Sequence, residues 1–272
     1  MAAIRPLLER VLSRRRPSPL ICPPLNIGHR GASGEAPENT LAAFELALRQ
    51  GADGVEFDVR LSADGVPVAL HDARLDRTTS GSGLVSRHRV AALKRLDAGS
   101  WFNERYPARS SVRYVGLKIP LLREVLEWAR LRRKRVYVEV KAGRDTPDGI
   151  ERKVLDEIYR AGVSRLTTVI SFDLACLRRL RGLDSEISLG VDFTRALLAL
   201  RRSEELSATA LLPYWMVASR RLIRRAHRSG LQVITWNLNR QHWMRRKIAD
   251  GVDGIITNDP ATLEMVRRQL TT

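Results

Sequence analysis

The chain has 272 residues, enough to bury the core of one large α/β domain or of two smaller ones. Hydrophobic residues make up 44% of it and charged residues 28%, a balance typical of soluble globular proteins. The formal net charge of +17 favours anionic partners such as phospholipid headgroups, phosphate esters or nucleic acid. No apolar run approaches the roughly 20 residues that cross a bilayer, so we expect no transmembrane helix.

The cysteines indicate the cellular compartment, and the distribution of the basic residues indicates which anionic partners to expect. Cys22 and Cys176 have no metal-type spacing, which favours a reducing, cytoplasmic compartment over a secreted disulfide scaffold. Charged residues interrupt the N-terminal apolar positions, so the pattern is not that of a signal peptide. Basic residues gather in clusters without interleaved aromatic residues, at 14–16, 130–135, 220–225 and 245–247. These clusters fit solvated helix faces, and we expect no nucleic acid partner.

Residues 1–24 form a basic extension ahead of the regular part of the chain. Apolar residues recur at spacings of three and four up to about residue 16, which predicts a short amphipathic helix that prolines then end. One interpretation is a helix lying on an anionic membrane surface, where each arginine adds roughly 1 kcal/mol. It would put a cytoplasmic protein at the inner membrane surface. The other interpretation is an N-terminal extension that is frayed or that docks on the protein itself.

From residue 25 onward, short apolar strands alternate with amphipathic helices. We expect strands at 25–29, 54–59, 135–141, 166–171, 186–191, 209–213, 231–236 and 252–257. The expected helices begin at Asn39 as N-cap and then cover 121–133, 149–161, 173–181, 195–202, 219–228, 240–249 and 260 to the C-terminus. Eight strand-helix units predict an α/β fold, a closed (β/α)8 TIM barrel over residues 25–272.

One stretch after the second strand unit departs from this alternation. The apolar segment 66–71 follows the second strand across a turn, and residues 73–118 are rich in Arg, Ser and Gly without a regular period. We expect 73–118 to be a small insertion of short helices and loops in the barrel domain.

Acidic residues at the ends of two predicted strands point to a metal. Glu56 and Asp58 stand two apart in VEFDV, so both side chains face the same side of an extended strand. Glu139 and Lys141 repeat the spacing in VEVK. Three carboxylates without cysteine favour one Mg²⁺ or Ca²⁺ over a structural zinc. The alternative is a buried acid-base network in which Lys141 and Arg30 neutralise the acids.

Two histidines accompany these acids, again at predicted strand ends. His29 and His71 flank the carboxylate pair in sequence, and phosphodiester cleavage needs a base for the nucleophile and an acid for the leaving alkoxide. Arg30 and Lys141 suit phosphoryl oxygens. Barrel enzymes build their sites where their strands end, so we expect these residues to meet at one face.

The motifs as a set resemble the glycerophosphodiester phosphodiesterase family. They are HRG, PENT, VEFDV, HD followed by LDRTTSGSG, IP before a helix, VEVK and the closing DGIITNDP, and they extend over about residues 25–270. The resemblance implies a TIM barrel that hydrolyses a glycerophosphodiester to sn-glycerol 3-phosphate and an alcohol with one divalent cation.

The resemblance also implies a role for each motif residue. His29 and His71 would be the acid-base pair, and the metal would be held by Glu56, Asp58 and Glu139. Three residues would bind the substrate. Arg30 and Lys141 would hold its phosphate, and Trp236 would line the substrate side of the site. Direct attack by water and attack by the glycerol hydroxyl to give a cyclic phosphate both remain open.

Two other functions remain open at this point. A lysophospholipase D acting on membrane lysophospholipids would explain the basic surface and the amphipathic N-terminus. A non-catalytic membrane or nucleic-acid binding protein that merely kept a barrel is the alternative of a different class, and the complete set of chemical residues speaks against it.

Overall fold

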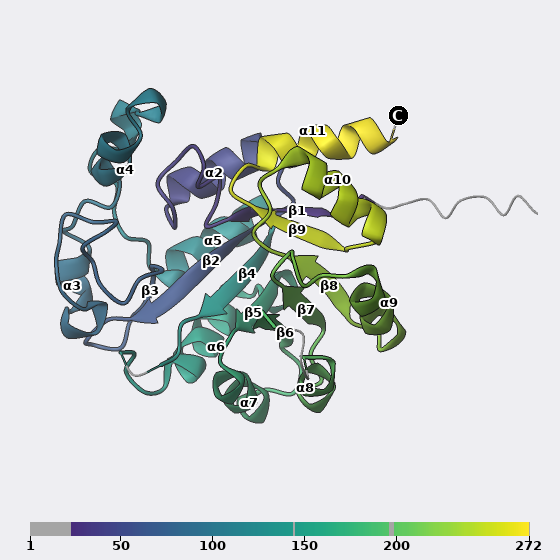
Figure 1. The fold of residues 1–272 in the computed structure, drawn as a ribbon. Coiled ribbons are helices and arrows are strands. Elements are labelled where there is room, and N and C mark those ends of the chain that lie inside the picture. Colours follow the sequence, from purple (N-terminus) through teal and green to yellow (C-terminus); the bar gives the residue numbers. More distant parts are fainter. Residues whose placement is uncertain (1–22, 144, 196–198, 272) are drawn as a thin grey trace, which may run out of the picture.

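The computed structural model describes residues 23–143, 145–195 and 199–271, and within them nine strands form one sheet (Figure 1). The strands are β1 (Leu25–His29), β2 (Gly54–Leu61), β3 (Pro67–Ala69), β4 (Arg135–Val140), β5 (Thr167–Ser171), β6 (Ser188–Phe193), β7 (Ala210–Pro213), β8 (Gln232–Thr235) and β9 (Gly254–Thr257). The predicted N-terminal helix lies outside the described residues.

Eight of these strands close into a parallel barrel. They follow the order β1-β9-β8-β7-β6-β5-β4-β2, and β1 pairs with β2 to close the ring. The ninth strand, β3, runs antiparallel to β2 and pairs with its C-terminal end. The predicted (β/α)8 fold is therefore confirmed.

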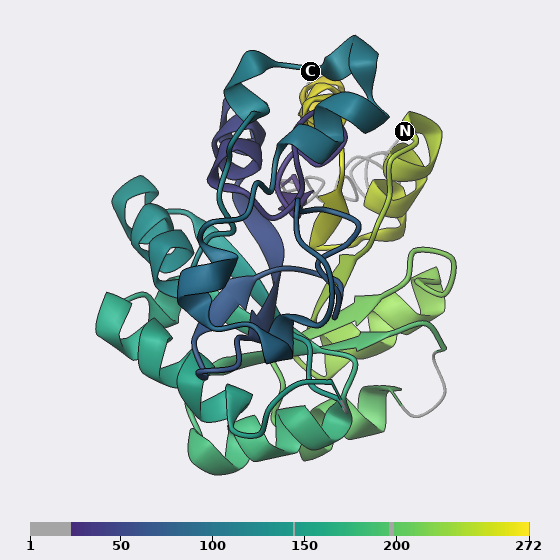
Figure 2. The ribbon, with the colours of Figure 1, turned by 90° about the vertical axis from the view of Figure 1, so that its left-hand side faces the viewer.

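Helices surround the barrel in a ring, as Figure 2 shows from the side of the insertion. They are α2 (Leu41–Arg49), α5 (Leu122–Arg132), α6 (Ile150–Ala161), α7 (Leu174–Leu183), α8 (Ala199–Glu205), α9 (Arg220–Arg228), α10 (Gln241–Asp250) and α11 (Pro260–Thr271). None of the helices in the described ranges has the length and apolar character needed to cross a bilayer.

Two apolar layers hold the barrel together. The outer layer lies between strands and helices and includes Val55, Phe57 and Val59, which alternate with the acids of β2. The inner layer fills the barrel with Ile27, Tyr137, Ile170, Ala210, Leu212, Ile234 and Ile256. Because the layers use opposite faces of each strand, polar residues that follow an inner-layer residue by two positions reach the mouth of the barrel.

Residues 73–118 contain short helices and loops. These are η1 (Val85–Arg87), α3 (Val90–Leu93), α4 (Ser100–Arg105), η2 (Pro107–Arg109) and η3 (Val112–Tyr114). Their apolar side chains form a separate small core with β3. Tyr114 and Arg109 donate hydrogen bonds to the backbone oxygens of Glu35 and Gly34, so this segment packs beside the loop that follows β1.

Several expected boundaries were wrong, and two of them bear on the site. Thr40, not Asn39, is the N-cap of α2, because Asn39 has a left-handed backbone (φ 58°) and its side chain bonds to Asp58 instead. Strand β6 ends at Phe193 rather than at residue 191. The apolar run ends at Val191, but the hydrogen-bonded ladder continues through Asp192, which pairs with Leu212.

Candidate active site

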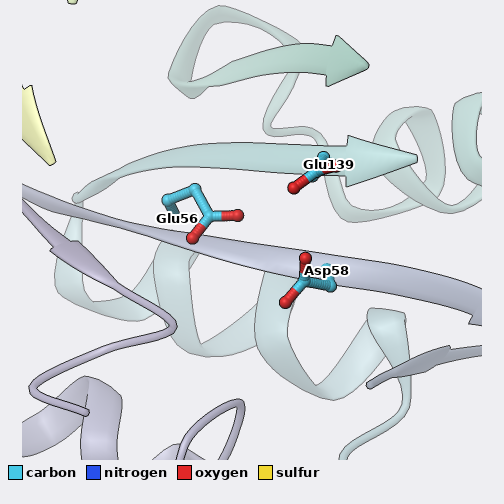
Figure 3. A group of neighbouring side chains, drawn as sticks. All are labelled: Glu56, Asp58 and Glu139. Atoms are coloured by element: carbon cyan, nitrogen blue, oxygen red, sulfur yellow. The ribbon is translucent and has the colours of Figure 1, made fainter. Parts of the chain in front are cut away.

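Strand register brings the acidic residues together at the mouth of the barrel. In the parallel ladders His29 lies beside Glu56, and Asp58 lies beside Glu139. Figure 3 shows Glu56 and Asp58 on one strand and Glu139 on the next, with their carboxylates turned toward one another. Oxygen atoms of the three carboxylates lie within 4.8 Å of one another.

A shared spacing explains why these side chains point into the mouth. Five residues at the mouth follow an inner-layer residue by two positions: His29 follows Ile27, Glu139 follows Tyr137, Phe172 follows Ile170, Trp236 follows Ile234 and Asn258 follows Ile256. Side chains two apart on a strand share a face, so the apolar plug below and the polar group above come from the same strand.

Asp58 is the most heavily contacted of the three acids. It is fully buried, its Oδ2 accepts a hydrogen bond from Asn39 Nδ2 at 2.8 Å, and Arg30 Nε lies 3.2 Å from the same oxygen. Lys141 Nζ lies 3.0 Å from Asp58 Oδ1 and 2.6 Å from Glu139 Oε1. Two cations therefore hold Asp58 in its charged form.

The electrostatics of the cluster are not balanced by these two cations alone. Burial, followed by the negative charge of Asp58, raises the pKa of Glu139 to about 7 and that of Glu56 well above its usual range. Burial also acts to raise the pKa of Asp58, but Lys141 and Arg30 outweigh it and hold that pKa well below its usual range.

The donor set fits a hard divalent cation. All three groups supply oxygen, the preferred ligand of Mg²⁺ and Ca²⁺. Asp58 Oδ1 is buried and makes no well-aligned hydrogen bond with the described residues, although Lys141 lies close to it. A cation bound here would satisfy that oxygen and relieve the repulsion that raises the pKa of Glu56 and Glu139.

His29 is held by an amide at the end of β9. Its Nδ1 lies 2.6 Å from Asn258 Oδ1, so Nδ1 carries the proton and Nε2 is left as an acceptor, 3.9 Å from Glu56 Oε2. Burial, and then the charge of Arg30, lowers the pKa of His29 to about 4. The imidazole is therefore neutral at pH 7 and can accept a proton.

His71 has a carboxylate behind it. Its Nδ1 lies 2.6 Å from Asp72 Oδ1, and Asp72 Oδ2 accepts a hydrogen bond from Arg77 Nε at 2.6 Å. Arg77 also donates to Glu38, which in turn accepts from Arg30 Nη1 at 2.8 Å. One continuous network thus links His71 to Arg30 through a residue of the 73–118 segment.

One cavity joins these groups. Its volume is about 180 Å³, and its lining includes seven of the eight predicted site residues: His29, Arg30, Glu56, His71, Glu139, Lys141 and Trp236. The eighth, Asp58, touches the lining residues Arg30 and Lys141. The structure therefore brings the whole predicted set together.

Trp236 forms part of an aromatic wall. Its Nε1 donates to the backbone oxygen of Leu212 at 2.7 Å, which fixes the indole. The ring packs edge-on against Phe172 at 5.3 Å between centroids and against Tyr214 at 5.4 Å. Phe172 and Trp236 both line the cavity and give it an apolar part beside the charged groups.

Sequence reasoning missed several residues that support the site. Glu38 and Asn39 belong to the PENT motif and Asn258 to the closing DGIITNDP, so the motifs marked them without showing what they contact. Asp192 also lines the cavity, but no motif marked it.

Comparison with known proteins identifies the family. The model of the glycerophosphoryl diester phosphodiesterase family matches residues 29–262. The chain belongs to this family. A glycerophosphodiester phosphodiesterase of Caldanaerobacter subterraneus subsp. tengcongensis is 36% identical over 250 residues, which cover 90% of this chain and 98% of that protein. One from Bacillus subtilis is 33% identical over 90% of this chain and 86% of that protein.

Solved structures agree with the family assignment. A glycerophosphodiester phosphodiesterase from Agrobacterium tumefaciens is 31% identical with a TM-score of 0.77, covering 89% of this chain and 99% of that one. An Oleispira antarctica phosphodiesterase, solved with the product sn-glycerol-3-phosphate, is 29% identical with a TM-score of 0.78, covering 90% and 96%. The predictions of this family and of a phosphodiesterase are confirmed, and the names of these relatives favour them over a lysophospholipase D or a non-catalytic binder.

Proposed function

We propose that the chain hydrolyses glycerophosphodiesters to sn-glycerol 3-phosphate and an alcohol. The observation that carries the proposal is the single cavity in which two histidines, three clustered carboxylates and two cations converge. The similarity to a phosphodiesterase solved with sn-glycerol-3-phosphate supports this product. The membrane and lysophospholipid partners considered from the sequence receive no such support.

One divalent cation, Mg²⁺ or Ca²⁺, would be held by Glu56, Asp58 and Glu139. When bound, it supplies positive charge that polarises the phosphoryl group and offsets the charge developing in the transition state. Asn39 donates a hydrogen bond to the Asp58 carboxylate and accepts one from the Asp58 backbone N–H, which would orient the carboxylate toward such a cation.

Arg30 and Lys141 would bind the phosphate. Both lie on the cavity wall and both contact Asp58, so their charges are fixed at a short distance from the carboxylate cluster. Arg30 contacts Asp58 and Glu38 through Nε and Nη1 and would offer its remaining N–H groups to the two non-bridging phosphoryl oxygens, and Lys141 would add a point charge. Trp236 would line the side of the cavity that receives the uncharged part of the substrate.

His29 would act as the base and His71 as the acid. The pKa of His29, lowered to about 4, keeps Nε2 free to take a proton from the attacking hydroxyl of water or of the substrate's own glycerol. His71 donates from Nδ1 to Asp72, and this carboxylate stabilises the protonated imidazole that gives its proton to the leaving alkoxide. The new P–O bond forms as the P–O bond to the alcohol breaks.

The test is release of sn-glycerol 3-phosphate from glycerophosphocholine. EDTA should abolish release, and added Mg²⁺ or Ca²⁺ should restore it. His29→Ala and His71→Ala should each remain folded and lose about 10²- to 10⁴-fold in kcat. His242→Ala is the matched control, since His242 lies on α10 away from the cavity and should leave kcat unchanged. Activity that survives either site variant would overturn the acid-base roles.

A further inference from the structure

Asp192 is a buried carboxylate that the mechanism above does not use. It lies near the end of β6, is 5% exposed, and lines the same cavity as Glu139 and Lys141. Its Oδ2 has no hydrogen-bond partner among the described residues. A buried acid without a partner is costly, so its presence at a binding cavity calls for a ligand that donates hydrogen bonds.

The position of Asp192 separates it from the metal cluster. It is not among the three carboxylates whose oxygens gather within 4.8 Å. β5 lies between β4, which carries Glu139, and β6. Neighbouring strands are about 4.8 Å apart, so the two carboxylates project from backbones separated by roughly 9 Å.

The shape of the cavity decides which part of the substrate reaches Asp192. Its volume of about 180 Å³ holds a phosphate and little more than the glycerol moiety. Asp192 is buried within it, whereas Phe172 on the aromatic wall is 46% exposed and so lies nearer to solvent. The leaving alcohol varies between substrates and has to depart, which requires the open end of the cavity.

We propose that Asp192 accepts hydrogen bonds from the free hydroxyls of the substrate's glycerol moiety and thereby selects deacylated glycerophosphodiesters over lysophospholipids. This inference rests on the proposed function. An acyl chain on the terminal hydroxyl removes the donor that Asp192 needs and adds bulk in a closed part of the cavity. Sites built to bind a buried hydroxyl discriminate strongly against analogues that lack it.

The test measures kcat/KM for Asp192→Leu and Asp192→Asn on four substrates. These are glycerophosphocholine, glycerophosphoinositol, 1-acyl-lysophosphatidylcholine and bis(p-nitrophenyl) phosphate, which has no glycerol. For Asp192→Leu we expect about a 10- to 100-fold loss on both glycerol substrates and almost no change on the nitrophenyl ester. The ratio of lysophosphatidylcholine to glycerophosphocholine turnover should rise about tenfold or more. Asp192→Asn, which keeps the shape, should lose less.

Each contrary result has a distinct meaning. An equal loss on the nitrophenyl ester would show that Asp192 acts on the metal or the phosphate and would overturn the inference. A loss confined to glycerophosphocholine would assign Asp192 to the cationic headgroup and would overturn it as well. Full activity of both folded variants on both glycerol substrates would likewise overturn the inference. Failure of the wild-type protein to release sn-glycerol 3-phosphate at all would instead overturn the proposed function.

Discussion

Arg77 joins the 73–118 segment to both sides of the cavity, and its removal tests whether that segment supports catalysis. Its guanidinium contacts Asp72 Oδ2 at 2.6 Å and Glu38 Oε2 at 2.7 Å. Without it, Asp72 loses the partner that orients it toward His71, and Glu38 loses a partner that holds it against Arg30. Supporting hydrogen bonds of this kind are typically worth about 10- to 100-fold in activity.

We predict that Arg77→Gln lowers kcat by about 10- to 100-fold and changes KM by less than about threefold. The Arg77 side chain is 44% exposed, so solvent screens its ion pairs and the free energy of unfolding should fall by only about 1–2 kcal/mol. Steady-state kinetics on glycerophosphocholine and urea unfolding measure the two effects. Arg74→Gln is the control, because Arg74 pairs only with the exposed Asp76 among the described residues. A kcat of Arg77→Gln within about twofold of wild type would refute the reasoning.

Three further predictions follow from the same packing and charges. Asn39→Ala should lower the free energy of unfolding by about 2–4 kcal/mol in urea titrations, because it removes the bonds to Asp58 and puts alanine at a left-handed position. Gly190→Ala should lower Tm, since its Cβ would lie 2.4 Å from the fully buried Leu212 Cδ1; an unchanged Tm would contradict this. The pKa of Glu139 is raised to about 7 and that of Glu56 well above its usual range, so metal binding must release protons at lower pH, and calorimetry should show affinity falling by at least about tenfold per pH unit below 7.

The barrel was predictable because its strands and helices have clear periods. Alternating apolar runs showed the eight parallel strands, and strand ends carry the site in any barrel of this kind. Two strand ends were placed too early, since β2 continues to Leu61 and β6 to Phe193. In β6 a polar residue stopped the apolar run. Asp192 was missed for this reason, since a lone acid after an apolar strand also fits an exposed turn.

The identity of the site residues was more predictable than their partners. Glu56 and Asp58 are two residues apart, which predicts that their side chains share one face of a strand. In the structure both lie on β2 with their carboxylates on the same side. Tertiary contacts do not follow from spacing. Asn39 is a residue type that is common at helix N-caps, but its side chain donates a hydrogen bond to Asp58, and Thr40 is the N-cap of α2. A local preference gave way to a buried hydrogen bond because Asp58, a buried member of the carboxylate cluster, needed a donor.

The charges at the mouth of the barrel affect the binding of the metal, the binding of the substrate and the protonation of His71. Within the described residues that line or touch the cavity, four buried carboxylates gather: Glu56, Asp58, Glu139 and Asp192. Two cations, Arg30 and Lys141, face them, and burial raises the pKa of Glu56, Glu139 and Asp192. A divalent cation held by the cluster would offset the negative charge of its carboxylates when they ionise. A phosphodiester then adds one negative charge. Burial lowers the pKa of His71, and Arg30 and Lys141 add to that effect, whereas Asp58 and the hydrogen bond to Asp72 act to raise it. The charge of the phosphodiester acts in the same direction as these two carboxylates and supports the protonated form that an acid for the leaving alcohol requires.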